Sequence, residues 1–163
     1  MRTLLTMKEQ AEFLANNYRL THIEHKWSCR GYGNSKIIDN LGDVVSRASG
    51  YGYDRFGTVV GDYIETVFQA ELNKLGKRFC KTVYTKERKA SKEFYGMFYN
   101  PKTGKTTLDG ACGHYCMYRI LNCIGFELVQ VASTDNKGQN GSVFYELRPV
   151  SAYNKKYFVN RVK

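Results

Sequence analysis

The longest periodic run of apolar residues lies in the first half of the chain. Between Phe56 and Leu75, apolar side chains recur at intervals of three or four residues, which is the spacing of one face of an α-helix. These side chains belong to Phe56, Val59, Val60, Tyr63, Ile64, Val67, Phe68, Leu72 and Leu75. Gly76 follows, and glycine is the usual residue just beyond a helix. The pattern predicts one continuous helix that ends at Gly76.

Two further segments have helical character. Thr6 and Glu9 have the spacing of a capping box before an apolar stretch, which predicts a helix over residues 7–18. A helix is also predicted over residues 113–123, where Gly125 would stop it. Its inward face would hold Cys112, Cys116, Ile120 and Cys123 or Ile124.

Alternation of apolar and polar residues predicts strands elsewhere. A first strand over residues 20–29 would end at Gly31, Gly33 and Asn34. Residues 36–49 fit either a helix or a strand, and we favour an extended path towards the glycine turn that follows. Residues 77–92 are expected to form an exposed basic loop, with Val83 and Tyr84 in part of a strand. A hairpin is predicted for 94–99 with 105–108, and a final strand pair for 126–132 with 142–149.

The order of these elements predicts the fold class. Helices alternate with strand pairs, which favours a single α+β domain over residues 1–163 with a mainly antiparallel sheet and two or three helices on one face. The chain has 163 residues, of which 42% are apolar and 25% are charged, so one globular core is expected and a collagen-like or disordered chain is excluded. No uncharged apolar run reaches the roughly 18 residues of a spanning helix.

Charge is distributed unevenly along the chain. The net charge is +10, from 25 Lys and Arg against 15 Asp and Glu. Residues 1–76 hold 9 basic and 9 acidic side chains, whereas residues 77–163 hold 16 basic and 6 acidic ones, so the second part carries the whole excess. No basic amphipathic helix accompanies this excess. A polyanionic partner is therefore expected, and nucleic acid is favoured over a membrane surface.

Two segments interleave basic and aromatic residues, as surfaces that bind RNA do: residues 77–105 and the end of the chain, 153–163. The alternative is a solvated basic loop beside a strand whose aromatic rings face the core. The candidate nucleic-acid-binding residues are Lys77, Arg78, Lys81, Lys86, Arg88, Lys89, Lys92, Lys102, Lys105, Tyr95, Tyr99, Lys155, Lys156 and Arg161.

Glycine-rich turns precede the two long predicted helices. Gly50 and Gly52 precede one helix, and Gly110 and Gly113 open the other, so either turn would offer backbone N–H groups to a phosphate. The alternative is that both are plain turns. Neither matches a nucleotide-binding fingerprint, so no cofactor is predicted.

Cysteine and histidine suggest two other sites. The five cysteines are interpreted as free thiols in a reducing cytoplasm, because the chain starts without a signal-peptide pattern. Cys112, His114, Cys116 and Cys123 form one cluster rather than the two that a structural zinc site uses, so no metal is predicted.

A metal-independent ribonuclease is an alternative function. His25 or His114 would act as acid or base, Tyr53 would replace one imidazole, and Arg55 would contact the phosphate. His25 fits a buried structural histidine equally well.

Several short motifs resemble small proteins of bacteriophages and mobile elements. Those proteins share a G-Y-G-Y-D-K/R turn and a later glycine-rich helix that ends in Ile-Gly-aromatic; here the motifs are Ser49 to Arg55, Gly110 to Gly113, and Cys123-Ile124-Gly125-Phe126. Some proteins from that setting are anti-CRISPR proteins. The resemblance covers residues 44–131 and implies an inhibitor of a Cas effector–guide RNA complex in the cytoplasm of a bacterial host. A module whose basic face docks an acidic host protein is a further alternative.

Overall fold

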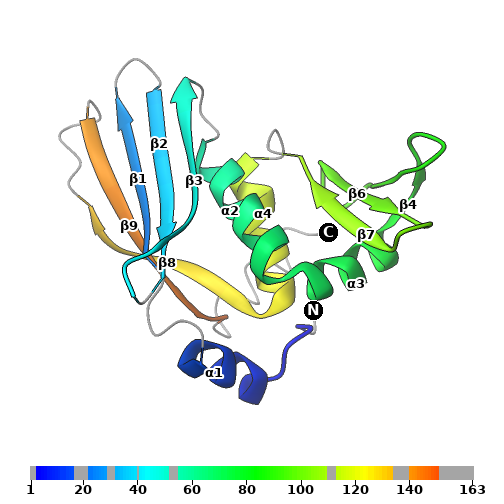
Figure 1. The fold of residues 1–163 in the computed structure, drawn as a ribbon, viewed down its shortest axis with the longest axis horizontal. Helices are drawn as coiled ribbons and strands as arrows, with labels where there is room; N and C mark the ends of the chain where they lie inside the picture. The colour runs from blue at the N-terminus through cyan, green and yellow to red at the C-terminus, as the bar shows by residue number, and fades with distance from the viewer. Residues whose placement is uncertain are drawn as a thin grey trace.

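Two antiparallel sheets lie on either side of a helix pair in the computed structural model (Figure 1). The structure describes residues 3–16, 22–28, 32–39, 41–51, 55–109, 113–133 and 140–150. The described helices are α1 (Met7–Asn16), α2 (Arg55–Val67), α3 (Gln69–Phe79) and α4 (Gly113–Ile124). The described strands are β1 (His22–Ser28), β2 (Tyr32–Ile38), β3 (Val44–Tyr51), β4 (Cys80–Val83), β5 (Lys89–Ser91), β6 (Met97–Asn100), β7 (Lys105–Leu108), β8 (Phe126–Ser133) and β9 (Asn140–Pro149).

Each sheet has its own helical cover. The larger sheet has the order β3-β2-β1-β9-β8, and α2 and α4 contact it through β2, β3 and β8. The smaller sheet has the order β4-β5-β6-β7 and packs on α3 (Figure 1). One apolar core joins both parts, because it includes Ile37 of β2, Leu147 of β9 and Met97 of β6. The prediction of a single α+β domain with antiparallel pairing is confirmed, although the strands divide into two sheets.

Most predicted elements are present. The helix predicted over 113–123, the first strand and the final strand pair are confirmed, and the helix predicted over 7–18 is confirmed for residues 7–16, beyond which residues 17–18 lie outside the described part. The hairpin is confirmed with its first strand at 97–100 rather than 94–99. Residues 36–38 and 44–49 are extended as favoured and belong to β2 and β3, whereas Leu41 and Gly42 lie in the turn between these strands. The first strand ends at Ser28, before the predicted stop at Gly31, Gly33 and Asn34, and Gly33 and Asn34 belong to the next strand, β2, where they pair with Gly50 and Ser49.

The basic segment is more ordered than the sequence predicts. Residues 77–79 complete α3, and residues 80–83 and 89–91 form β4 and β5, so the prediction of an exposed loop is wrong there. Strand β5 pairs with β6, and β4 pairs with β5. Strands β4 and β5 therefore extend the hairpin of β6 and β7 into a larger sheet. Their sequences do not alternate between apolar and polar residues, so the sequence pattern does not predict them.

The predicted long helix breaks at Phe68. This residue has φ −117° and ψ 34°, which is not helical, and it separates α2 from α3. Its buried ring lies 4.9 Å from the ring of Phe13, 5.8 Å from Tyr63 and 5.3 Å from Phe126, measured between centroids. The periodic pattern continues across the break because both helices face the same core, so the prediction of one helix ending at Gly76 is wrong.

The edge strand β7 is attached to the helices by side chains spaced four residues apart. The Leu108 N–H donates to the Glu65 carboxylate, the Thr106 N–H donates to Asn73 Oδ1 at 2.8 Å, and Gln69 Nε2 donates to the Thr106 carbonyl at 3.1 Å. These bonds satisfy backbone groups that an edge strand would otherwise expose. Burial raises the pKa of Glu65. The smaller sheet is therefore held to α2 and α3 by specific polar contacts as well as by its apolar face.

Gly76 allows α3 to approach β7 closely, and we expect Gly76→Ala to destabilise the protein. A Cβ at this position would lie 1.9 Å from Thr106 Oγ1. We expect the free energy of unfolding to fall by about 1–3 kcal/mol, because overpacking outweighs the better helix propensity of alanine. Urea unfolding measures the change. Gly61→Ala in α2 is the control, because its Cβ would meet only the flexible end of Met117. A Gly76→Ala protein as stable as the wild type would contradict the close approach.

The described cysteines are core residues. Cys80, Cys116 and Cys123 are buried, which confirms the inward face predicted for Cys116 and Cys123. Burial raises the pKa of Cys80 and of Cys123 to about 11, so both remain protonated thiols at neutral pH. Cys112 lies outside the described residues.

Candidate nucleic-acid interface

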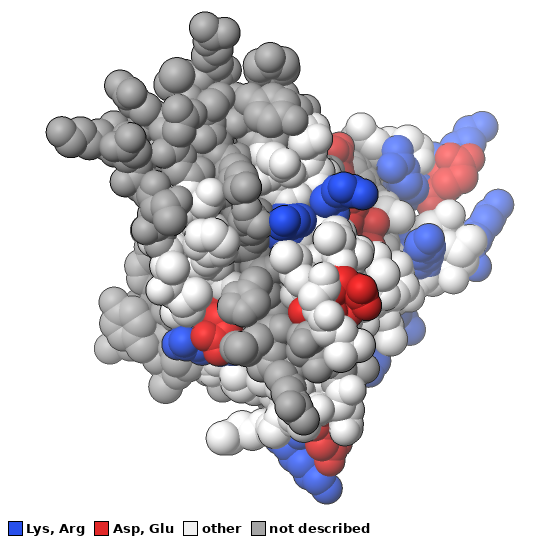
Figure 2. Space-filling model, turned by 60° about the vertical axis from the view of Figure 1, so that its left-hand side comes forward, with Lys and Arg blue, Asp and Glu red and all other residues white. Residues whose placement is uncertain are grey.

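The predicted contact segment forms one end of the molecule, which we call the basic sheet (residues 77–105). It comprises the last turn of α3, strands β4 to β6 and the start of β7, and it carries nine basic side chains against two acidic ones, Glu87 and Glu93. Lysine and arginine side chains project along the right-hand margin of the space-filling view (Figure 2). The structure therefore gathers cations that are spread over 29 residues of sequence onto one small sheet.

The basic side chains of this sheet are accessible. Eight of the nine are exposed and Lys89 is half-buried. The exposed ones are Lys77, Arg78, Lys81, Lys86, Arg88, Lys92, Lys102 and Lys105. The ion pairs observed in the described part of the chain, such as Lys8 with Glu12 and Arg148 with Glu146, do not involve a cation of the basic sheet.

The aromatic side chains of the basic sheet divide between core and surface. Phe94 is fully buried, Phe98 and Tyr99 are half-buried, and Tyr95 is 73% exposed. Tyr84, at the end of β4, is 58% exposed. Tyr95 and Tyr99 are the rings that the sequence selects as binding residues. The structure adds Tyr84 and Phe98.

Tyr84, Arg88 and Phe98 form a compact group, which we call the Tyr84 cluster. The rings of Tyr84 and Phe98 lie 4.8 Å apart between centroids, at an interplanar angle of 45°. The guanidinium carbon of Arg88 lies 5.5 Å from the Tyr84 ring centroid and 4.8 Å from that of Phe98. Sequence analysis missed this group because Tyr84 and Phe98 are brought together by the pairing of β4, β5 and β6, which the sequence did not predict.

The Tyr84 cluster lies on the face of the sheet that points away from α3. Thr106 faces α3 at Gly76, and Tyr99 pairs with Thr106 across β6 and β7. Because side chains alternate along a strand, Phe98 and its partner Thr107 point to the opposite face. The cluster is thus presented on the face without helical cover among the described elements.

A second row of cations and rings has a structural role. The guanidinium carbon of Arg78 lies 5.0 Å from the Phe79 ring centroid, and the Phe79 ring lies 5.1 Å from the Phe94 ring. The guanidinium carbon of Arg119, in α4, lies 5.0 Å from the Phe94 ring centroid. Arg119 also donates to the carbonyl of Glu93 at 3.1 Å. This row fastens α4 to the basic sheet, so Arg119 acts in packing rather than in ligand contact.

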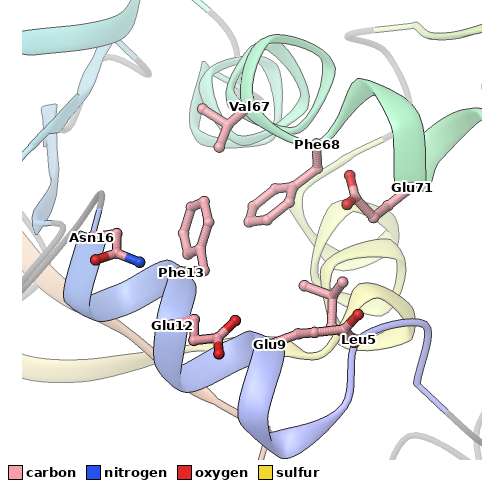
Figure 3. A pocket seen from close by; sticks show the side chains of 8 residues that line it. All are labelled: Leu5, Glu9, Glu12, Phe13, Asn16, Val67, Phe68 and Glu71. Carbon is pink, nitrogen blue, oxygen red and sulfur yellow. The ribbon is translucent and has the colours of Figure 1, made fainter.

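A groove of about 350 Å³ lies between α1 and the junction of α2 with α3 (Figure 3). Its apolar lining comes from Leu5, Phe13, Val67 and Phe68, and Glu9, Glu12 and Glu71 line its polar part. The Thr6 N–H donates to Glu9 at 2.7 Å, which holds the pKa of that carboxyl below its usual value. Ionised carboxylates here repel a polyanion, so the groove does not belong to the candidate interface.

The glycine turns are only partly described. Gly113 opens α4 as predicted, whereas Gly50 lies within β3 and pairs with Gly33, so Gly50 belongs to a strand rather than to a phosphate-binding turn. Gly52 and Gly110 lie outside the described residues, as do Tyr53 and the basic residues Lys155, Lys156 and Arg161.

The ribonuclease candidates occupy separate elements. His25 lies in the central strand β1, where its backbone pairs with Ser35 and Val143. His114 and Arg55 lie in the first turns of α4 and α2. The structure describes the backbone of these three residues, and their side chains lie outside the described part. Among the described residues, no group of three or more His, Cys, Asp or Glu side chains has the geometry of a metal site.

The chain was compared with protein families, curated proteins and solved structures. No family model, curated protein or solved structure matches this chain. No helix of the described residues is long and apolar enough to cross a membrane.

Proposed function

We propose that this chain binds nucleic acid, with RNA preferred, through the basic sheet. The observation that carries the proposal is the concentration of nine accessible or half-buried cations, without ion-pair partners among the described residues, around exposed aromatic rings. Cations attract the phosphate backbone and release its counterions, while rings offer surfaces to bases. The resemblance to phage and mobile-element proteins extends the proposal: the bound RNA would belong to a Cas effector complex that the chain inhibits.

The proposal predicts strongly salt-dependent binding. Affinity for a single-stranded RNA of about 20 nucleotides would be measured by fluorescence anisotropy between about 50 and 200 mM salt. If five phosphates are contacted, the affinity should fall about 100-fold over that range, because each contact contributes about 0.7 to the logarithmic slope. Absence of binding at about 50 mM salt, or binding that salt does not weaken, would contradict the proposal.

Two controls separate this function from its alternatives. Polyglutamate has the charge of an acidic protein partner without bases, so we expect it to compete with RNA only weakly. Equal competition would favour an acidic protein as the partner. RNA should also remain intact during incubation with the protein in EDTA. Cleavage under these conditions would favour the metal-independent ribonuclease instead.

A further inference from the structure

We infer that the Tyr84 cluster is a stacking site for an unpaired nucleobase of single-stranded RNA. This inference rests on the proposed function. It identifies the Tyr84 cluster as the part of the basic sheet that prefers single-stranded RNA to duplex RNA. Tyr84 is 58% exposed although its ring lies 4.8 Å from the Phe98 ring. Phe98 and Arg88 therefore contact one part of this side chain, and the exposed part is open to a planar partner.

The cluster is held in place by its turn. The N–H of Tyr84 donates to the carbonyl of Arg88 at 3.0 Å, and the N–H of Arg88 donates to Thr85 Oγ1 at 3.1 Å. The N–H of Thr85 also donates to the Arg88 carbonyl, at 3.1 Å. These bonds fix the two residues across the turn between β4 and β5. A base that stacks here meets a preformed surface, which reduces the entropy cost of binding.

Arg88 supplies the polar half of the site. Its guanidinium carbon lies 5.5 Å from the Tyr84 ring centroid and 4.8 Å from that of Phe98, within the range of a cation–π contact. Among the described residues, no hydrogen bond or ion pair engages the Arg88 side chain. Its donors are thus available to a phosphate or a base edge beside the stacked base.

The position of the cluster favours a single strand. In a duplex the base faces are covered by neighbouring bases, whereas a single strand can turn a base outward onto an aromatic ring. Lys86 lies in the same turn and is exposed, so a phosphate next to the stacked base finds a cation close by. The basic side chains bind both forms of RNA, and the cluster adds affinity for the unpaired form alone.

The experiment compares Tyr84→Ala with Tyr84→Phe and with Leu41→Ala. Leu41→Ala is the control for loss of an exposed side chain, because Leu41 is 80% exposed and lies outside the basic sheet. We expect Tyr84→Ala to weaken binding of single-stranded RNA about tenfold and to leave duplex binding unchanged within about twofold. Leu41→Ala should bind both as the wild type does, and Tyr84→Phe should keep the wild-type affinity because it keeps the ring.

A second readout reports stacking directly. An RNA that contains 2-aminopurine loses fluorescence when that base stacks on a ring, so quenching should occur with wild type and Tyr84→Phe and should be absent with Tyr84→Ala. Salt-dependent binding by the wild type that Tyr84→Ala does not weaken, or weakens equally for duplex, overturns this inference and leaves the proposed function standing. Failure of the wild type to bind any RNA at low salt overturns both.

Discussion

Replacement of Lys86, Lys89 and Lys92 together by glutamine is expected to lower the affinity for single-stranded RNA by about 100-fold at roughly 0.1 M salt, if the proposed function holds. The estimate follows from the loss of three phosphate contacts, each worth about 0.7 in the logarithmic salt slope. Lys86 and Lys92 are exposed, Lys89 is half-buried, and all three lie in or beside strand β5. The slope itself should fall by about 2.

A triple substitution by glutamine outside the basic sheet is the control for the change in net charge. Lys8, Arg47 and Lys74 are exposed and lie outside the basic sheet, so their replacement by glutamine also removes three positive charges. We expect this triple variant to keep the wild-type salt slope and to lose less than about threefold in affinity, through the weaker overall field alone. Equal losses in the two triple variants would show that net charge, rather than the basic sheet, determines binding.

Substitution of Phe68 by alanine is expected to lower the free energy of unfolding by about 3–5 kcal/mol. Phe68 is 2% exposed and its ring contacts Phe13 of α1, Tyr63 of α2 and Phe126 of β8. Removing the ring leaves a cavity where three elements meet, and it also removes the edge-on contact with Tyr63, at an interplanar angle of 88°. Chemical denaturation followed by circular dichroism measures the loss.

Two variants test the cause of this destabilisation. Phe68→Leu keeps much of the buried volume and should cost clearly less than the alanine variant. Tyr95→Ala removes an exposed ring and should change the free energy of unfolding by less than about 0.5 kcal/mol. A Phe68→Ala protein with wild-type stability would mean that the junction of α2 and α3 does not depend on this aromatic contact.

Acidic and basic side chains gather on different parts of the molecule, the acidic groove and the basic sheet. Glu9, Glu12 and Glu71 line the groove beside α1, whereas the cations gather at the far end of α3 and on the smaller sheet (Figures 1 and 3). Under the proposed function, the basic sheet would attract a polyanion and the groove would repel it, so the partner would be oriented before contact. The uneven charge along the sequence thus becomes an uneven charge in space.

The sequence alone determined the elements whose signals are local. The capping pair of Thr6 and Glu9 fixed the start of α1, and the cysteine and isoleucine stripe fixed the inward face of α4. Gly125, with φ +135°, ends that helix in a conformation that suits glycine. The excess of cations after Gly76 required no structure to find, because charge is counted without knowing where a side chain lies.

Only the tertiary structure decided the features that depend on distant residues. The break at Phe68 follows from rings supplied by α1, α2 and β8, and Gly76 remains within a helix because β7 comes close to it. The Tyr84 cluster exists because β5 brings β4 and β6 into one sheet, although β5 has no apolar alternation of its own. Periodicity records which side of an element faces the core. It does not record which elements meet, since that choice depends on the total burial and hydrogen bonding of the folded chain.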